Sequence, residues 1–387
     1  MINTKIMKKF FLTILIVLAC FLSNLSQLPY FISKGSTQIL SIPIWILLFI
    51  TLIVTNRFKI SKALINILVL MVLFIMILII LYIISSKDYF SSSLFYSTLI
   101  SVFILIIGSL ISPIFNKDIF RYIVISYVLS SLVVSLVVFV KYFGIGFSLD
   151  TRVYAYSSKN SLSQIILTSI IILFCYFKPR NNWEKVNKII IIIFDIFMLF
   201  ILRSRASILG FTIVSLIIAF DNKRTNIRYR RIVIIAGILS LILLSISDEF
   251  KDLLLNKIIF AGRDFNDLDN LSSGRISILR DFPVLIRGNW LTGIGSIYFE
   301  SFPLSAILQF GIFAGGILIY LSILPLLTSA KRRNNELRSL LYYISIAYFV
   351  NSLFEGLAPF GPGIKCYFLW LLYGILNSKG SLELEKG

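Results

Sequence analysis

The sequence predicts an all-α polytopic membrane protein with about twelve transmembrane helices. Of its 387 residues, 58% are apolar and only 14% are charged, and the mean hydropathy is +0.93. A soluble protein cannot hide so much apolar surface behind a mostly polar and charged exterior. The apolar residues also form runs of roughly 14–25 residues, about the length of helix that crosses a ~30 Å hydrocarbon core. These observations exclude a soluble multidomain enzyme, a secreted disulfide scaffold and a disordered chain.

The predicted transmembrane helices follow one another along the whole chain. They cover residues 10–28, 39–55, 63–84, 94–113, 120–140, 161–177, 189–202, 206–220, 232–247, 303–327, 339–354 and 364–377. With the N-terminus inside, most of the 37 Lys and Arg residues fall in inner segments, whereas the 18 Asp and Glu residues favour outer ones. This is the positive-inside distribution of membrane proteins. It accounts for the net charge of +19 without nucleic acid, and it predicts that both termini are cytoplasmic.

The first apolar run has two interpretations. Lys8 and Lys9, followed by an apolar stretch that ends at Cys20, resemble a lipoprotein signal sequence. However, Leu18 is large for the position two residues before such a cysteine, and the apolar run continues through Phe21. We therefore expect the first helix to be retained.

The chain divides into residues 1–247 with nine helices, a large outer loop at 248–302, and residues 303–387 with three helices and a short tail. Loops as long as 248–302 are uncommon unless they are functional or disordered. This loop is rich in charged and turn residues, yet Ile276, Leu279 and Val284 recur with a helical rhythm. We expect an ordered, partly amphipathic cap, with a solvated linker as the alternative.

The stretch Arg203-Ser204-Arg205 separates two short apolar runs, 189–202 and 206–220. Helices of that length reach only about 21–23 Å, less than the ~30 Å hydrocarbon core. We therefore expect both guanidinium groups below the outer surface, where they suit a phosphate or pyrophosphate, with snorkelling boundary residues as the alternative. Asp195, on the first run, is expected either to have a structural partner or to relay a proton.

Two further outer segments carry polar candidates. Glu355 follows the eleventh predicted helix in a turn at membrane level, where boundary polarity explains it as well as chemistry does. The loop 141–160 contains Arg152, Tyr154 and Asn160. Cationic and aromatic side chains suit phosphate contact and sugar stacking, but they are also common at the membrane interface.

Residue types exclude some chemistry. The chain contains no histidine, which excludes an imidazole acid or base, a zinc–histidine site and a Ser-His-Asp triad. Its cysteines, Cys20, Cys175 and Cys366, are scattered through apolar runs without CxxC spacing. The sequence shows neither a Gly-rich phosphate loop nor a metal-binding motif, so we expect no metal and no other cofactor.

Three patches follow one another on the predicted topology. They are Arg203 to Gly210 (RSRASILG), Ser273-Gly274-Arg275 with Arg280, and Gly293-Ile294-Gly295 with Glu300-Ser301 and Gln309-Phe310-Gly311. These patches resemble the SRxxxLG, SGR and GIG…HN…Gly elements of the O-antigen and capsule repeat-unit polymerases (the Wzy type) and of the related O-antigen ligases. Arg263 and Gly274 also satisfy an Arg-x10-Gly spacing described for some of these polymerases. The resemblance implies a GT-C-like membrane fold.

The resemblance implies a metal-independent glycosyltransferase in the bacterial cytoplasmic membrane. Its donor is a growing polysaccharide on undecaprenyl pyrophosphate, whose anomeric carbon is attacked by the non-reducing end of a lipid-linked repeat unit. Fixed cations at the leaving pyrophosphate are then the most valuable electrostatic element. The candidates for contacts to the pyrophosphate and the glycan are Arg203, Arg205, Arg275, Arg280, Arg263 and Arg152. Glu300 is the first candidate for the base that takes the hydroxyl proton, and Glu355 is the second.

One departure from the family pattern bears on the reaction. Where the ligases carry a histidine in the HN element, this chain has Glu300-Ser301, which favours a polymerase over a ligase. A ligase or another lipid-linked glycosyltransferase is one alternative, and a lipid-linked oligosaccharide flippase or secondary transporter is another. A transporter should show more polar residues near the midplane and inverted halves. The expected partners are the lipid bilayer and the undecaprenyl-pyrophosphate-linked oligosaccharide, together with a chain-length regulator and a flippase.

Overall fold

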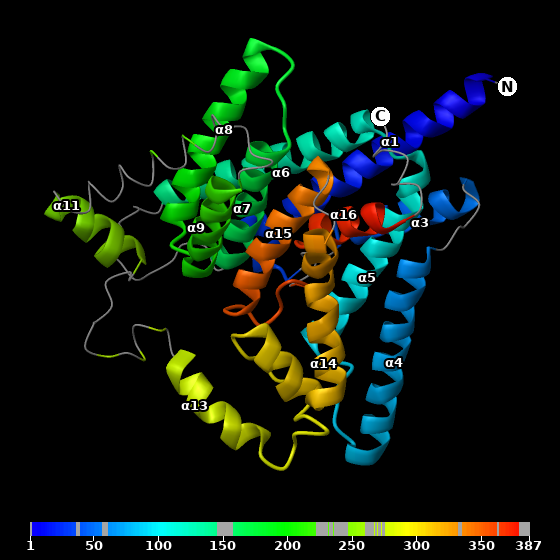
Figure 1. The fold of residues 1–387 in the computed structure, drawn as a ribbon, viewed down its shortest axis with the longest axis vertical. Helices are drawn as coiled ribbons and strands as arrows, with labels where there is room; N and C mark the ends of the chain where they lie inside the picture. The colour runs from blue at the N-terminus through cyan, green and yellow to red at the C-terminus, as the bar shows by residue number, and fades with distance from the viewer. Residues whose placement is uncertain are drawn as a thin grey trace.

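In a computed structural model the protein is helical. The structure describes residues 2–35, 39–55, 61–144, 158–221, 231, 235, 247–259, 267, 269, 272, 275–331, 335–361 and 364–378, and these ranges contain no β-strand. The first helices are α1 (Ile2–Leu25), α2 (Pro29–Ser33), α3 (Ile42–Thr55), α4 (Lys62–Ser85), α5 (Ser93–Ile111), η1 (Ser112–Ile114), α6 (Lys117–Gly144), α7 (Lys159–Cys175), α8 (Asn182–Ile201) and α9 (Arg205–Phe220). They are followed by α11 (Asp248–Lys251), the π-helix η2 (Asp252–Ile259), α13 (Arg275–Ile286), α14 (Phe302–Lys331), α15 (Glu336–Ser352) and α16 (Tyr367–Asn377) (Figure 1).

Many of these helices suit a lipid bilayer. Five are long and apolar enough to cross it, namely Met7–Leu25, Lys62–Ser85, Ser93–Ile114, Lys117–Lys141 and Phe302–Lys331, while α3, α7, α9 and α16 are shorter but also apolar. The chain is therefore a multi-pass membrane protein. Each predicted transmembrane segment coincides with a helix except 232–247, almost all of which lies outside the described residues. The number of spans thus stays a prediction.

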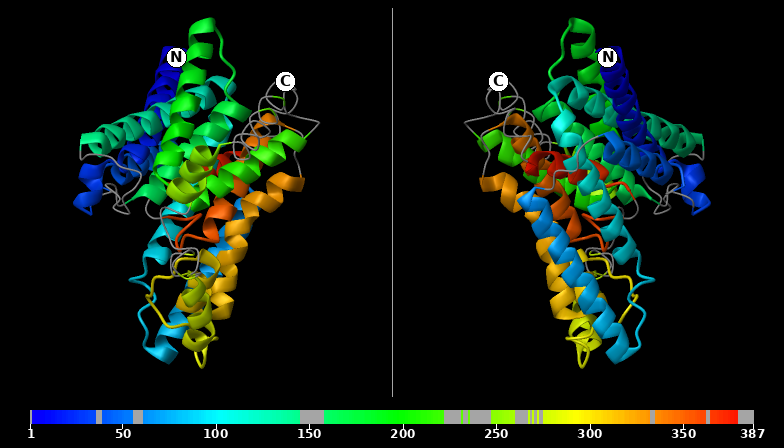
Figure 2. Two further views of the ribbon diagram at one scale, coloured as in Figure 1. Left: turned by 90° about the vertical axis from the view of Figure 1, so that its left-hand side faces the viewer. Right: turned by 90° about the vertical axis from the view of Figure 1, so that its right-hand side faces the viewer.

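Charged helix ends gather on one face of the molecule. Three ion pairs join α6, α8, α15 and the connection between α7 and α8; they are Arg121–Glu184 at 2.6 Å, Arg180–Asp118 at 3.1 Å and Lys178–Glu336. This face is the upper end in Figure 1, whereas α13 and one end of α4 lie at the opposite end (Figures 1 and 2). All six residues belong to segments that the charge pattern predicts to be inner. The ion pairs therefore agree with the predicted alternation of helix direction.

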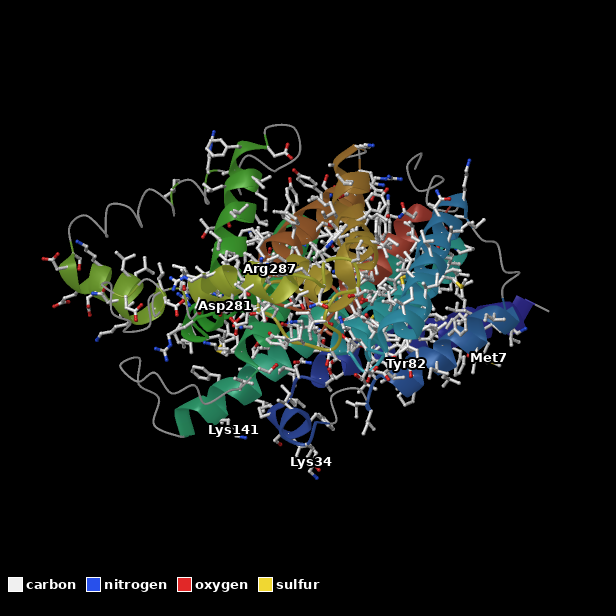
Figure 3. All side chains as sticks on the ribbon, turned by 90° about the horizontal axis from the view of Figure 1, so that it is seen from below. Met7, Lys34, Tyr82, Lys141, Asp281 and Arg287 are labelled. Atoms are coloured by element: carbon white, nitrogen blue, oxygen red, sulfur yellow. The ribbon has the colours of Figure 1, made fainter. Side chains whose placement is uncertain are left out.

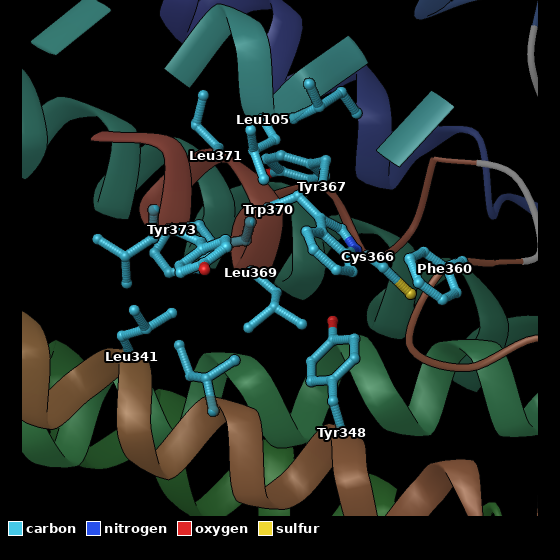
Figure 4. Close-up of a cluster of buried hydrophobic side chains, with 14 of the residues drawn as sticks. Leu105, Leu341, Tyr348, Phe360, Cys366, Tyr367, Leu369, Trp370, Leu371 and Tyr373 are labelled. Carbon is cyan, nitrogen blue, oxygen red and sulfur yellow. The ribbon is translucent and has the colours of Figure 1, made fainter. Parts of the chain in front are cut away.

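The core is densest where α5 and α16 cross. Gly108 of α5 and Gly374 of α16 lie so close to the opposite backbone that a Cβ on either would collide with a carbonyl oxygen, of Leu371 and Leu105 respectively. Small residues allow such close approach between helices in membranes. Large rings fill the space around this crossing, and the rings of Phe360 and Trp370 stack with their centroids 5.0 Å apart (Figure 4). This packing holds the connection between α15 and α16 against the helix bundle.

The length of α8 differs from the prediction. The helix begins at Asn182, because the side chain of Asn181 caps it by accepting a hydrogen bond from the Glu184 amide at 2.8 Å. Its twenty residues reach about 30 Å, but the residues added at its start include Glu184, Lys185 and Lys188, and α8 is not among the five helices that are long and apolar enough to cross a bilayer. Residues 182–188 are mostly polar and resemble a loop in composition. They nevertheless form the first turns of the capped helix, where Glu184 pairs with Arg121. The α9 helix, with sixteen residues, has about the predicted length.

Candidate functional site

A cluster of charged side chains lies towards the end of the molecule opposite to the ion-pair face, where the connection between α15 and α16 lies above α13 in Figure 1. It is built from Arg275, which starts α13, Glu300 in the connection to α14, and Glu355 in the connection between α15 and α16. Figure 3 looks onto this end of the molecule and labels Asp281 and Arg287, both exposed, on and just after α13. The predicted outer loop 248–302 and the connection between α15 and α16 thus contribute to one candidate site, although their residues are far apart in the sequence.

Arg275 connects the parts of this site. Its Nε lies 3.7 Å from Oε2 of Glu300, and its terminal nitrogen donates a hydrogen bond to the carbonyl oxygen of Phe354 at 3.2 Å. The guanidinium group also lies over the Phe354 ring, 5.3 Å from the ring centroid. Because only a planar guanidinium can make all three contacts, lysine would not replace Arg275 conservatively. The Glu300 side chain keeps 43% of its surface exposed, so it is accessible to a substrate.

Glu355 lies behind this pair in a more enclosed environment. Asn160, near the start of α7, donates a hydrogen bond to its Oε1 at 2.5 Å. Burial raises the pKa of the Glu355 carboxyl above its usual value, and the carboxylate of Glu300 acts in the same direction, while Lys365 and Arg275 oppose the rise. The Lys365 side chain is 1% exposed, and its Nζ donates to Oγ of Ser161 at 3.3 Å. One neighbouring carboxylate and two cations therefore act on the pKa of Glu355.

The backbone that carries Glu300 is held by the connection between α4 and α5. Nζ of Lys87 donates to Oδ1 of Asn289 and to the Gly293 carbonyl oxygen, each at 2.7 Å. The hydroxyl of Tyr89 donates to the Thr292 carbonyl oxygen at 2.8 Å. These bonds fix the turn that precedes Glu300, so α4 and α5 take part in positioning the site.

The turn that precedes Glu300 is also held by backbone hydrogen bonds where it crosses α14. The amides of Ile294 and Gly295 donate to the carbonyl oxygens of Leu308 and Gln309 at 2.7 and 3.1 Å, and the Ile312 amide donates to Trp290 at 2.9 Å. They pair the turn with α14 at a break in that helix, where Gly311 has φ 74°. Only glycine suits this backbone conformation, which explains the glycines of the Gly-Ile-Gly and Gln-Phe-Gly patches.

The structure brings together three of the predicted site residues, Arg275, Glu300 and Glu355. It leaves Arg280 exposed on α13, where no ion pair links it to another described residue. Arg152 and Arg263, like Ser273 and Gly274 of the SGR patch, lie outside the described residues.

The arginines between α8 and α9 are sunken to different degrees. Arg203 is 3% exposed and adopts φ 49° in the turn, whereas Arg205 is the first residue of α9 and is half-buried. The burial of Arg203 agrees with the prediction that its guanidinium group lies below the surface of the protein. Asp195 is fully buried in α8 beside Ser169 of α7.

Lys365 was not among the predicted site residues, and no pattern in the sequence predicts the contact of Asn160 with Glu355. The available signal for Lys365 was a single cation at the start of the last apolar run, 364–377. A charge at that level of a membrane protein is costly and usually has a partner. Within the ranges that the structure describes, no group of three or more His, Cys, Asp or Glu side chains is placed to hold a metal ion.

Residues 190–317 match the family model Wzy_C, described as O-antigen ligase. The matched segment includes Arg203, Arg205, Arg275 and Glu300, and it ends before Glu355 and Lys365. The match supports the O-antigen ligase/polymerase superfamily, whose members are enzymes that act on lipid-linked glycans. It does not separate a polymerase from a ligase. None of the curated proteins matches the chain.

Proposed function

We propose that this protein is a polysaccharide repeat-unit polymerase. It would transfer a growing glycan from undecaprenyl pyrophosphate to the non-reducing end of a lipid-linked repeat unit, on the outer face of the bacterial cytoplasmic membrane. The observation that supports this reaction best is the cluster of Arg275, Glu300 and Glu355 in a chain that contains no histidine. Carboxylates supply a base, and guanidinium groups supply the charge that a leaving pyrophosphate requires.

In the proposed step, a hydroxyl oxygen of the acceptor attacks the anomeric carbon of the donor. The bond from that carbon to the pyrophosphate oxygen breaks, and its electron pair leaves with the lipid pyrophosphate. The hydroxyl proton passes to a carboxylate of the enzyme. Charge separates in this transition state between an oxocarbenium-like sugar and the pyrophosphate, so fixed cations lower its free energy more than that of the bound substrates.

We assign the role of the base to Glu355, and we assign to Glu300 the role of positioning Arg275. Burial favours this order, because a carboxyl with a raised pKa is a stronger base and titrates closer to neutral pH. Glu300 is ion-paired with Arg275 and stays more exposed, which suits a residue that orients the guanidinium group towards the pyrophosphate. Arg280, Arg203 and Arg205 remain candidates for contacts to the lipid pyrophosphate, as do Arg263 and Arg152. A chain-length regulator and a flippase would be the protein partners of such a polymerase.

An O-antigen-type ligase is the second candidate, because the matching family model is described by that activity. The two reactions share a lipid-linked glycan donor and differ in the acceptor. A ligase that relied on an imidazole in the HN element would lack it here, since Glu300-Ser301 occupies the corresponding place.

Deletion of the gene in its native host distinguishes these reactions when the surface polysaccharide is separated on a gel. Single repeat units in place of the ladder of polymer lengths support the polymerase. Full-length polymer that stays on its lipid carrier supports the ligase, repeat units trapped on the cytoplasmic side support a flippase, and an unchanged ladder contradicts all three.

Complementation then tests the residues at equal protein levels. Arg275→Ala should fail to restore the ladder. Arg280→Ala should restore part of it, because Arg280 makes none of the contacts to Glu300 and Phe354 that position Arg275. Removal of a single fixed donor to a developing anion typically slows a reaction about 10²–10³-fold. Equal defects in both variants would contradict the distinction that we draw between the two arginines.

A further inference from the structure

A pocket of about 570 Å³ opens between α1 and α6, on the ion-pair face and away from the proposed glycan site. This volume lies within the about 300–1,000 Å³ of pockets that hold small molecules. Its floor is apolar and includes Ile14, Val17 and Phe21 of α1 and Ile119 of α6. Nothing in the proposed glycan chemistry uses these residues.

We call this pocket the wedge, and hydrogen bonds tie the two helices together at its deep end, which contains Val17 and Phe21. The hydroxyl of Ser126 donates to the Val17 carbonyl oxygen at 2.8 Å, and Nδ2 of Asn24 donates to Oγ of Ser130 at 2.9 Å. Towards their N-termini the helices leave room for the pocket between them. From Lys9 to Phe21 the pocket follows α1 for about 18 Å, which is close to half of the ~30 Å hydrocarbon core.

Polar side chains line the open end of the wedge. Lys9, Asn116, Asp118 and Tyr122 lie there, next to the apolar floor. The Asp118 carboxylate is paired with Arg180 at 3.1 Å, whereas no described carboxylate pairs with Lys9. The Oδ1 of Asn116 caps α6 by accepting from the Ile119 amide at 2.8 Å, which leaves its Nδ2 as a hydrogen-bond donor. The rim therefore offers an uncompensated cation and neutral donors.

We infer that this pocket binds one anionic phospholipid of the leaflet that surrounds the N-terminal end of α1. An acyl chain would fill the wedge over Ile14, Val17 and Phe21, and the phosphate would contact Lys9, with Asn116 and Tyr122 as donors. The apolar depth fits a chain of one leaflet, and the cationic rim fits a negatively charged headgroup. Basic pockets between helices recognise lipid headgroups in this way. The bound lipid would fill the gap between α1 and α6 and brace the first helix.

Native mass spectrometry of the purified full-length protein tests this inference. Phosphatidylglycerol and phosphatidylethanolamine are titrated separately, and the fraction of protein that carries one lipid is measured. We expect about fivefold tighter binding of phosphatidylglycerol, because its headgroup has a net negative charge beside Lys9, whereas the ammonium group of phosphatidylethanolamine offsets the charge of its phosphate. Lys9→Gln should remove this preference. The matched control is Lys8→Gln, which changes a neighbouring exposed lysine outside the pocket and should keep the preference.

A second pair of variants tests the wedge itself. Ile14→Trp fills the pocket and should weaken binding of both lipids at least tenfold. Phe11→Trp, at a 51% exposed position of α1 outside the pocket, should leave binding unchanged. Equal affinity for the two lipids together with no effect of Ile14→Trp would overturn the inference. Protein dimers that disappear in Ile14→Trp would also overturn it, because a second copy would then occupy the pocket.

Discussion

Glu300 and Glu355 have the same side chain but different environments, and this difference divides their proposed roles. Glu300 is ion-paired with Arg275 and partly exposed, while Glu355 is more enclosed and accepts a hydrogen bond from Asn160. Burial raises the pKa of Glu355. A base must be ionised to accept a proton, so activity should rise with pH through the raised pKa of Glu355. The acidic limb of the pH profile should lie above the about 4.3 of an ordinary glutamic acid.

Glu355→Gln should lower the rate of glycan elongation about 10²–10⁴-fold and remove that acidic limb. It should also stabilise the protein at neutral pH. Because the pKa of Glu355 is higher in the folded than in the unfolded state, stability is lost as pH rises from the unfolded pKa through the folded pKa. Glutamine keeps an oxygen that can accept the Asn160 hydrogen bond. Elongation assays across pH and thermal unfolding in detergent measure both effects, and a less stable, fully active variant would contradict them.

At the scale of elements, the turn that carries Glu300 depends on a glycine at the break in α14. Gly311 has φ 74° and ψ 175°, and a Cβ there would collide with the carbonyl oxygen of Leu291. The adjacent amide of Ile312 donates to the Trp290 carbonyl oxygen at 2.9 Å. A side chain at position 311 would therefore separate α14 from the turn as well as strain the backbone.

Gly311→Ala should lower the free energy of unfolding by about 2–3 kcal/mol, because a non-glycine residue is strained in this conformation and the crossing must open. Gly316, in the same helix, is the matched control. A Cβ there meets nothing within 4 Å, so Gly316→Ala should be neutral or stabilise the helix by up to about 1 kcal/mol. Thermal unfolding of the two variants in the same detergent gives the comparison. Equal melting temperatures would show that the crossing does not constrain Gly311.

At the scale of the whole molecule, the two ends differ in the charges that they carry. Several predicted inner segments meet at the ion pairs, while Lys87, Arg275, Glu300 and Glu355 lie at the other end. The positive-inside rule assigns the first end to the cytoplasm.

Cysteine labelling of right-side-out spheroplasts measures this orientation. A membrane-impermeant maleimide should label Trp290→Cys directly and label Trp183→Cys only after permeabilisation. Both positions are exposed, at 55% and 73% respectively. The unmodified protein is the control, because Cys20 and Cys366 are buried and Cys175 is half-buried. The opposite labelling pattern would invert the topology and move the charged cluster to the cytoplasmic side.

The sequence predicted most of the described helices and three of the residues that the structure brings together, Arg275, Glu300 and Glu355. Long apolar runs leave few alternatives to helices, because backbone groups in a bilayer must bond within their own segment. The prediction failed at residues 182–188, whose polar composition resembles a loop although Asn181 caps the helix and Arg121 pairs with Glu184. Charged and glycine-containing patches of the sequence also indicated Arg275, Glu300 and Glu355 as candidates.

The grouping of those candidates required the folded chain. Packing of α7, α15 and α16 creates the environment of Glu355. It buries the carboxyl group, brings Asn160 into contact with it and places the charge of Lys365 nearby. No local pattern encodes the distance between residues that are far apart in the chain. Helix formation follows from hydrophobicity and backbone hydrogen bonding within a segment, whereas electrostatics at the site depends on distances and burial that packing between segments creates.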